Sequence, residues 1–263
     1  MTAGKVPEIT AAFWVVKVLT TGVGESASDY LATRLGPVPA VALAAIGLVA
    51  ALAAQFASSR HRPGIYWTAV LLVSVVGTMV ADFIHVVLHV PYLTSTLAFA
   101  VVLAAVLALW YATERSLSFH ELRTRRREVF YWLTVMATFA FGTAVGDLTA
   151  ATGHLGYLTS GLAFAAVIAL PAIAYRWFGL AAVPAFWCAY VLTRPLGASF
   201  ADWAAASPAH GGLGLGTGTV TITLVLAIAL LVGALALSRR EGGGGLQASP
   251  ADDRPRDETF AAR

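Results

Sequence analysis

Four stretches of the sequence share the pattern Gly-x4-Asp: GESASD at 24–29, GTMVAD at 77–82, GTAVGD at 142–147 and GASFAD at 197–202. A tryptophan stands fifteen residues before each aspartate, namely Trp14, Trp67, Trp132 and Trp187. The second and third copies also agree further on, where DFIHVVLHVPYLTSTLAF (82–99) and DLTAATGHLGYLTSGLAF (147–164) align without a gap. Matches at fixed offsets indicate a tandem repeat. We therefore predict that the chain consists of four copies of one unit.

The composition places these repeats in a membrane. Of the 263 residues, 58% are hydrophobic and 12% are Asp, Glu, Lys or Arg, which is about half the charged share of a soluble domain. Uncharged runs such as 39–58 and 216–238 reach the ~20 residues that cross a bilayer. An ordinary cytoplasmic enzyme, a disordered protein and a nucleic-acid binder are excluded. The single cysteine, Cys188, excludes an internal disulfide and a cysteine metal cage.

We predict an all-α integral membrane protein with eight transmembrane helices, two in each repeat. They are expected near 11–33, 39–58, 66–89, 92–112, 130–152, 155–177, 179–204 and 216–238. Residues 1–238 would form a single transmembrane domain with repeats at 10–58, 64–112, 129–177 and 184–238. Residues 239–263, rich in Gly, Pro and charge, are expected to be a disordered cytoplasmic tail. Basic residues flank one side of the predicted helices and only Arg34 the other, so the positive-inside rule places both termini in the cytoplasm.

The two-helix unit constrains the packing, because every copy then enters the membrane in the same direction. Parallel repeats of this kind are related by an axis along the membrane normal. The simplest arrangement is pseudo-fourfold, with the odd helices around the axis and the even helices outside. A pseudo-twofold pair of halves, 1–112 and 130–238, is the alternative. Both arrangements bring the repeated aspartates close together.

Four tandem two-helix units, each with a tryptophan, resemble a bacterial membrane-protein family catalogued as a "repeat of unknown function". The resemblance covers roughly residues 10–238. It implies the repeat architecture and a multi-pass protein of the bacterial plasma membrane, and it implies no activity. The function is therefore argued from the residues themselves.

Apart from Arg176 at the end of one helix, seven charged side chains lie within the predicted helices: Glu25, Asp29, Asp82, Asp147, Asp202, Lys17 and Arg194. A charge at the bilayer centre costs at least ~2.5–3.5 kcal/mol on insertion scales, so intramembrane acids usually have a function. Fifteen helical residues span ~22 Å, so tryptophans at the cytoplasmic surface would put the aspartates in the outer half of the membrane. We predict that the five acids bind a cation, for which oxygen ligands suit magnesium, calcium or manganese.

Two histidines of the third helix have ligand spacing relative to Asp82. Asp82, His85 and His89 fall at i, i+3 and i+7, on one face of a continuous helix, and histidine would shift the preference toward transition metals. His89 and His154 are equivalent in the repeats, and His210 lies in a similar outer position. Two interpretations stay open: a vestibule that captures metal or relays protons, or structural residues at turns and the membrane surface.

We expect a different role for each of the two basic residues and for Glu25. Arg194, followed by Pro195, is expected near the membrane middle as a counter-ion that competes with the transported cation. Lys17 is expected to extend to the cytoplasmic surface. Glu25 is present in the first copy alone, and we expect it to be an extra ligand or proton acceptor. Its place in the other copies is taken by Thr78, Thr143 and Ala198.

The favoured function is a secondary transporter or exporter of a divalent metal cation, preferably manganese, driven by an ion gradient because the sequence has no nucleotide-binding motif. The metal would be substrate, and the other partner is the lipid bilayer. Alternatives are a proton or cation channel with an acidic ring, an intramembrane metal-dependent enzyme using Asp82, His85 and His89, and a structural protein whose acids are protonated or pair with Lys17 and Arg194. No hydrolase or metalloprotease motif is present, so no catalytic residue is assigned and an enzyme is disfavoured. The sequence leaves the oligomeric state open.

Overall fold

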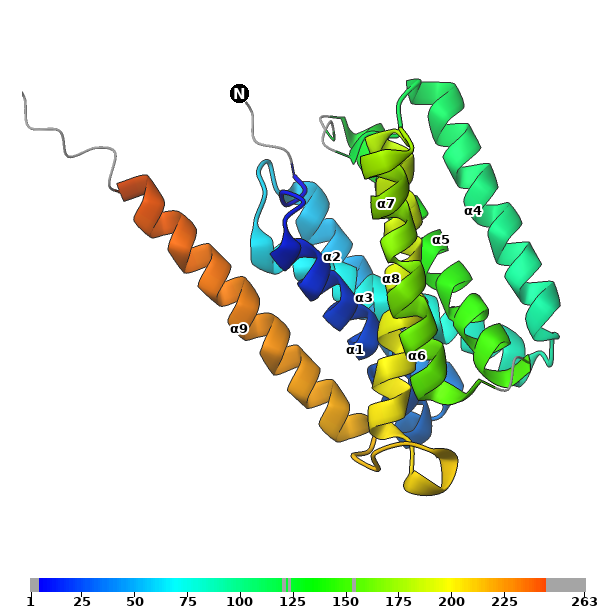
Figure 1. Cartoon of the computed structure of the whole chain (residues 1–263). Coiled ribbons are helices and arrows are strands. Elements are labelled where there is room, and N and C mark those ends of the chain that lie inside the picture. Colours follow the sequence, from blue (N-terminus) through cyan, green and yellow to red (C-terminus); the bar gives the residue numbers. More distant parts are fainter. Residues whose placement is uncertain (1–4, 120–121, 123, 153–154, 245–263) are drawn as a thin grey trace, which may run out of the picture.

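The computed structural model describes residues 5–119, 122, 124–152 and 155–244, and within them all regular secondary structure is helical (Figure 1). It confirms the eight predicted helices. They are α1 (Ala11–Leu35), α2 (Pro37–Ala57), α3 (Pro63–Asp82), α4 (Tyr92–Glu114), α5 (Arg125–Asp147), α6 (Gly156–Val167) continued by α7 (Ala169–Trp177), α8 (Ala182–Ala205) and α9 (Thr217–Gly244). The interruption between α6 and α7 precedes Pro171, whose ring nitrogen cannot donate a helical hydrogen bond.

Six of these helices are long and apolar enough to cross a membrane: α2, α3, α4, α5, α6 with α7, and α9. The chain is therefore a multi-pass membrane protein. The other two, α1 and α8, contain the charged residues Lys17, Glu25 and Arg194, all of which are buried. Their lower hydropathy thus reflects polar groups that the bundle encloses.

Four helices form an inner ring, in which α1 packs on α3, α3 on α5, α5 on α8, and α8 again on α1. Each outer helix packs on the inner helix of the next repeat: α2 on α3, α4 on α5, α6 on α8, and α9 on α1. Burial separates the two sets. About two thirds of the residues in the apolar parts of α3 and α5 are buried, 61% and 67%, against 11% to 28% in the outer helices. The expected placement of odd helices inside and even helices outside agrees with these contacts.

The repeated glycines make the inner ring tight. Each lies within a continuous helix at a point where a Cβ atom would come closer than 3.0 Å to a side chain of the next inner helix. The pairs are Gly24 with Ser74, Gly77 with Phe139, Gly142 with Arg194, and Gly197 with Thr21. In every pair the partner stands three residues before the next glycine of the ring. The glycines therefore permit close helix approach and do not break the helices.

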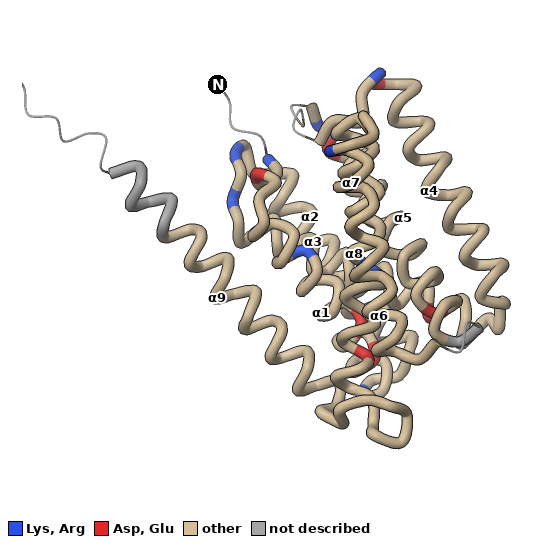
Figure 2. Tube along the Cα trace, viewed as in Figure 1, with Lys and Arg blue, Asp and Glu red and all other residues tan. Residues whose placement is uncertain are grey.

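The two ends of the bundle differ in charge (Figure 2). Most basic residues lie at the end where α1 begins, which we call the basic end, and Arg34 lies near the opposite end (Figure 2). Helix α9 continues to Gly244, beyond the expected start of the cytoplasmic tail at residue 239. The rest of that tail, 245–263, lies outside the described residues.

Candidate functional site

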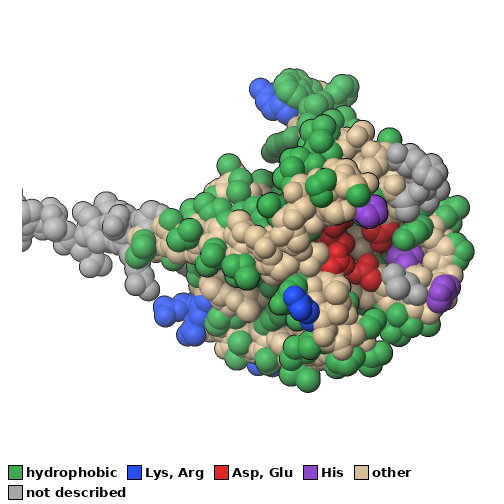
Figure 3. Space-filling view, turned by 90° about the horizontal axis from the view of Figure 1, so that it is seen from below, with side chains coloured by type: hydrophobic (Ala, Val, Ile, Leu, Met, Phe, Trp, Pro, Cys, Tyr) green, Lys and Arg blue, Asp and Glu red, His purple; other side chains and the backbone are tan. Residues whose placement is uncertain are grey.

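A cavity of about 420 Å³ lies at the end of the inner ring opposite the basic end. Its lining includes all four repeated aspartates and the extra acid of the first copy: Glu25, Asp29, Asp82, Asp147 and Asp202. Seen from this side, the acidic side chains gather in a hollow of the surface, with histidines close by (Figure 3). The inner ring thus brings together five carboxylates that are up to 177 residues apart in the sequence. We call this space the acidic cavity.

The repeat explains why the aspartates converge. Each follows by five residues the glycine at which its helix contacts the next one, so all four lie just beyond the tightest part of the ring. In the second and third copies the α-helix ends at the aspartate, and a π-helical turn follows at Phe83–Val87 and Leu148–Thr152. Single π-helical turns are frequent at functional sites because they redirect side chains.

Three of the carboxylates are close enough to share one cation. Oxygen atoms of Glu25, Asp29 and Asp202 all lie within 4.8 Å of one another. Glu25 and Asp29 are one turn apart on α1, and Asp202 comes from the adjacent α8. Because Mg²⁺ and Ca²⁺ bind oxygen at about 2.0–2.6 Å, oxygens on opposite sides of such an ion lie about 4–5 Å apart. We call these three residues the acidic triad.

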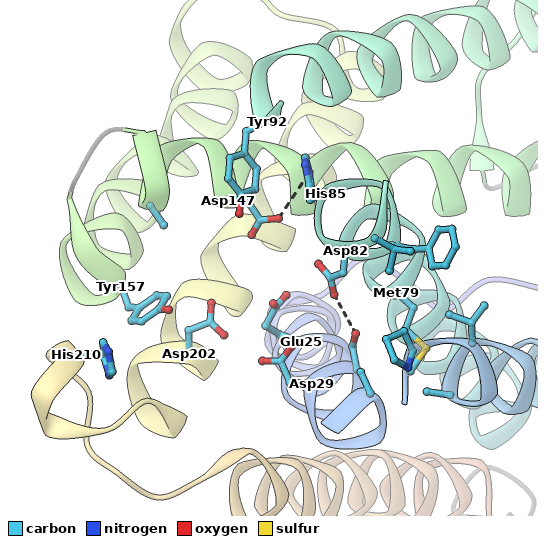
Figure 4. A pocket seen from close by; sticks show the side chains of 18 of the residues that line it. Glu25, Asp29, Met79, Asp82, His85, Tyr92, Asp147, Tyr157, Asp202 and His210 are labelled. Carbon is cyan, nitrogen blue, oxygen red and sulfur yellow. Dashed lines mark hydrogen bonds and ion pairs between the residues drawn. The ribbon is translucent and has the colours of Figure 1, made fainter. Parts of the chain in front are cut away.

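Asp82 from α3 and Asp147 from α5 line the same cavity beside the acidic triad (Figure 4). Asp82 accepts a hydrogen bond of 3.1 Å from the Ser28 hydroxyl. His85 Nε2 lies 3.9 Å from Asp147 Oδ2, and the His85 ring packs against Tyr92 with the ring centres 4.4 Å apart. His85 therefore lines the cavity as part of a pair with Asp147.

The shared face expected for Asp82, His85 and His89 does not extend to His89. The π-helical turn ends at Val87, and His89 is an exposed residue with a φ of 53°. Its Nδ1 lies 3.1 Å from the Val87 carbonyl oxygen, so this residue belongs to the turn and is outside the cavity lining. The equivalent residue, His154, lies outside the described residues.

Arg194 lies behind the cavity and contacts all three of the other inner helices. Its side chain is 1% exposed, and its Nη2 donates to Glu25 Oε2 at 2.5 Å. It also donates to Thr143 Oγ1 at 3.1 Å, to the Thr21 carbonyl oxygen at 3.2 Å and to Thr78 Oγ1. Glu25, Thr78 and Thr143 occupy the same repeat position, directly after the glycine of the Gly-x4-Asp pattern. The expected ion pair with the carboxylates thus exists, and Glu25 is the partner.

The side chain of Lys17 does not lie where the sequence predicted. It is 1% exposed and does not extend to the surface. Its position on α1, four and eight residues before Thr21 and Glu25, points it into the inner ring. The ammonium lies 4.0 Å from the ring centre of Phe139 and 4.2 Å from that of Tyr190, and such cation–π contacts replace part of its hydration. Among the described residues no carboxylate oxygen forms an ion pair with it.

Aromatic residues close the inner ring between Lys17 and the basic end. The tryptophans of the second, third and fourth copies are 4% to 6% exposed. An aromatic residue precedes every repeat tryptophan: Phe13, Tyr66, Tyr131 and Phe186. The hydroxyl oxygens of Tyr66 and Tyr131 are 2.6 Å apart and buried. These aromatic residues recur at the repeat spacing in the sequence, but the prediction considered the tryptophans alone.

Two tyrosines of the cavity were also missed. Tyr92 and Tyr157 line it and stand at the same place in the matching YLTS segments of the second and third copies. His210 lines the cavity too, and its Nδ1 lies 2.9 Å from Ser207 Oγ. The cavity therefore combines carboxylates with phenol and imidazole groups. In the part of the chain that the structure describes, one guanidinium forms an ion pair with these five carboxylates, which favours a positively charged ligand in this low-dielectric setting.

Four segments of the chain match one family model, described as Repeat of Unknown Function (DUF347), at residues 12–61, 65–116, 130–180 and 185–241. Each segment contains one inner helix and the outer helix that follows it. Comparison with curated proteins and with solved structures finds no match. Because the four segments cover most of the chain, the protein belongs to the Repeat of Unknown Function family and consists of four of its repeats.

Proposed function

We propose that the protein is a secondary transporter of a divalent metal cation, with manganese the favoured substrate. The observation that carries the proposal is the convergence of five carboxylates from all four repeats on one accessible cavity. Burying five negatively charged groups inside a membrane protein costs free energy, and a cation substrate would offset that cost. The acidic triad is the proposed binding position.

The proposed orientation places both termini in the cytoplasm and opens the acidic cavity to the outside. The gathering of basic side chains at the other end supports this orientation (Figure 2), because short cytoplasmic loops carry an excess of Lys and Arg. All eight helices would cross the membrane. The four equivalent glycine contacts support a pseudo-fourfold axis along the membrane normal.

The donor atoms favour a hard or borderline divalent ion. Carboxylate oxygens suit Mg²⁺, Ca²⁺ and Mn²⁺, whereas an imidazole is a better ligand for transition metals. His85 faces Asp147 within the same cavity. The imidazole and the carboxylate of this pair could coordinate an ion as it enters or leaves. This combination supports manganese over calcium.

Arg194 would act as a resident cation that the substrate replaces. A metal ion at the acidic triad competes with Arg194 for Glu25, because that carboxylate belongs to both sets of contacts. Arg194 also donates to residues of α1, α3 and α5. A change in these hydrogen bonds would therefore alter the contacts of Arg194 with all the other inner helices. Rocking of the repeats would follow.

The closed half of the bundle favours a carrier over a channel. Between the acidic cavity and the basic end lie Arg194, then Lys17 with its aromatic neighbours, then the repeat tryptophans. Two buried cationic groups in this path would repel a metal cation. An open pore with an acidic ring would need a continuous polar path in its place.

Ion flux in proteoliposomes tests the proposal. We expect ⁵⁴Mn uptake by the intact chain and its loss in Asp29→Asn and Asp202→Asn, because each removes one charged ligand of the acidic triad. Glu114→Gln is the matched control, since Glu114 pairs with Arg126 and Arg127 on α5, outside the cavity lining. Full uptake by both triad variants would contradict the mechanism, and gradient-independent unitary conductance in planar bilayers would favour a channel.

A further inference from the structure

Two residues outside the four repeats meet at the basic end of the bundle. Lys5 precedes the first matched segment, and Glu128 lies between the second and the third. Lys5 Nζ donates to Glu128 Oε2 at 2.6 Å, and the side chains are 17% and 1% exposed. This ion pair links the segment before α1 to the start of α5, on the opposite side of the ring.

The segment that carries Lys5, residues 5–10, lies against the aromatic part of the core. Pro7 is buried, and Val6 and Ile9 pack on the hydrophobic cluster that includes the repeat tryptophans. His61 Nδ1 lies 3.1 Å from the Lys5 carbonyl oxygen, which holds the segment to the turn before α3. We call residues 5–10 the strap.

One carboxylate oxygen of the ion pair between the strap and α5 lacks a hydrogen bond. Glu128 Oε1 is buried and has no hydrogen-bond partner among the described atoms. A buried carboxylate oxygen without a donor is costly, and water would satisfy it if the strap moved away. Closing the strap therefore gains an ion pair and loses hydration of the same carboxylate, so the lost hydration offsets part of the gain.

We infer that the strap is the cytoplasmic gate of the transporter, and that separation of Lys5 from Glu128 opens the inner half of the bundle to the cytoplasm. The inference rests on the proposed transport function and orientation. In the described conformation the acidic cavity is accessible on one side (Figure 3), while the strap and the aromatic residues cover the other. Alternating access requires the opposite state as well. The strap is the part of this cover that lies outside the four repeats and that an ion pair joins to α5.

Cysteine labelling tests the gate without requiring transport. Cys188 is exposed and is first replaced in Cys188→Ser. A probe is then introduced by Val135→Cys, a fully buried position one turn beyond Tyr131 on the inner face of α5. A membrane-impermeant maleimide is applied from the cytoplasmic side of oriented vesicles. We expect slow labelling of the probe in the otherwise intact chain and several-fold faster labelling in Lys5→Ala, because the strap then lacks its ion pair.

Two variants make the test specific. Charge reversal in Lys5→Glu/Glu128→Lys restores the attraction and should restore slow labelling. Arg126→Ala removes a basic residue that is 67% exposed at the same end of the bundle, and it should leave the labelling rate unchanged. Should Lys5→Ala fail to fold, Lys5→Ala/Glu128→Gln removes both charges together and gives the same readout.

An unchanged labelling rate in Lys5→Ala would overturn the gate. This failure is distinguishable from failure of the proposed function. A wrong gate leaves ⁵⁴Mn uptake intact in Lys5→Ala with unchanged labelling. A wrong transport function leaves the labelling difference between Lys5→Ala and the intact chain, with no uptake by either.

Discussion

Arg194 is held in the middle of the membrane bundle by one acid, two hydroxyl groups and one carbonyl oxygen from three other helices. Pairing with Glu25 is what makes its burial tolerable, since a buried charge without a partner costs several kcal/mol. The pair in turn positions Glu25 beside Asp29 and Asp202. At the scale of single residues, Arg194 thus connects the fold to the acidic cavity.

Removal of Arg194 alone should destabilise the protein strongly. In Arg194→Gln we expect a loss of about 3–5 kcal/mol, the usual effect of breaking a buried ion pair. The double variant Glu25→Gln/Arg194→Gln should recover part of that loss, because neither member of this ion pair is then left charged without the other. Thermal unfolding in detergent measures both. Equal midpoints for Arg194→Gln and the intact protein would show that the ion pair does not stabilise the fold.

Lys17 should behave in the opposite way. In Lys17→Met the new side chain keeps most of the aliphatic length and removes a buried ammonium that has aromatic neighbours and, within the described part of the chain, no carboxylate partner. Replacing even a buried ion pair by apolar groups of similar volume is often neutral or stabilising by about 1–4 kcal/mol, and the same desolvation cost applies to the Lys17 ammonium. We expect a thermal midpoint equal to or above that of the intact protein. A large decrease would mean that the ammonium itself stabilises the folded state.

Side-chain direction was the part of the site that the sequence predicted least well. The repeat alignment selected the four aspartates, and the scarcity of charge within the predicted helices selected Glu25 and Arg194. The five acids line the acidic cavity, and Arg194 pairs with one of them. Lys17 was expected at the surface because distance from its tryptophan was used without knowing which face of α1 is inside. His89 was placed on a helical face because the π-helical turn that ends at Val87 leaves no clear pattern in the sequence.

At the scale of the helices, the repeated glycines decide how closely the inner ring packs. Each helix contacts the next where a glycine faces the residue three places before the following glycine. From the sequence, these glycines could permit close helix approach or a local break of the helix, and the structure shows close approach within continuous helices. The identity of the partner helix could not be predicted, because a repeat alone does not fix the order of helices around the axis.

Gly24→Ala should therefore disrupt the contact between α1 and α3. The added Cβ would overlap the Ser74 side chain and approach its backbone, and overpacking of this kind typically costs about 1–3 kcal/mol. Gly233→Ala is the matched control, because the space around Gly233 is open and alanine favours a helix. Thermal midpoints in detergent compare the two. Equal midpoints for both variants would contradict the close contact at Gly24.

At the scale of the whole molecule, four copies of a two-helix unit form a ring that is polar at one end and aromatic at the other. Each outer helix covers the inner helix of the next repeat, so neighbouring repeats are interlocked and the last outer helix, α9, returns to α1. Hydropathy and the repeat were sufficient to predict this number of helices. The low hydropathy of α1 and α8 is explained by the acidic cavity and Arg194, which need polar residues inside the ring.

The orientation makes a prediction for the whole molecule. In a Cys188→Ser background, Leu213→Cys lies in the exposed segment between α8 and α9, and Ser59→Cys lies in the exposed turn between α2 and α3. We expect an impermeant maleimide to label Leu213→Cys from outside intact cells and Ser59→Cys only after the membrane is broken. The reverse pattern would place the acidic cavity on the cytoplasmic side.

Metal-dependent thermal stabilisation of the detergent-purified protein is the most direct test of a cation site in the acidic cavity. A ligand that binds only the folded protein stabilises it by RT ln(1 + [L]/Kd), or about 2.7 kcal/mol at a concentration of 100 Kd. We expect a dose-dependent rise in the unfolding midpoint with Mn²⁺, absent in Asp29→Asn/Asp202→Asn and retained in Glu114→Gln. No shift with any divalent cation, or an equal shift in the double variant, would contradict cation binding by the acidic triad.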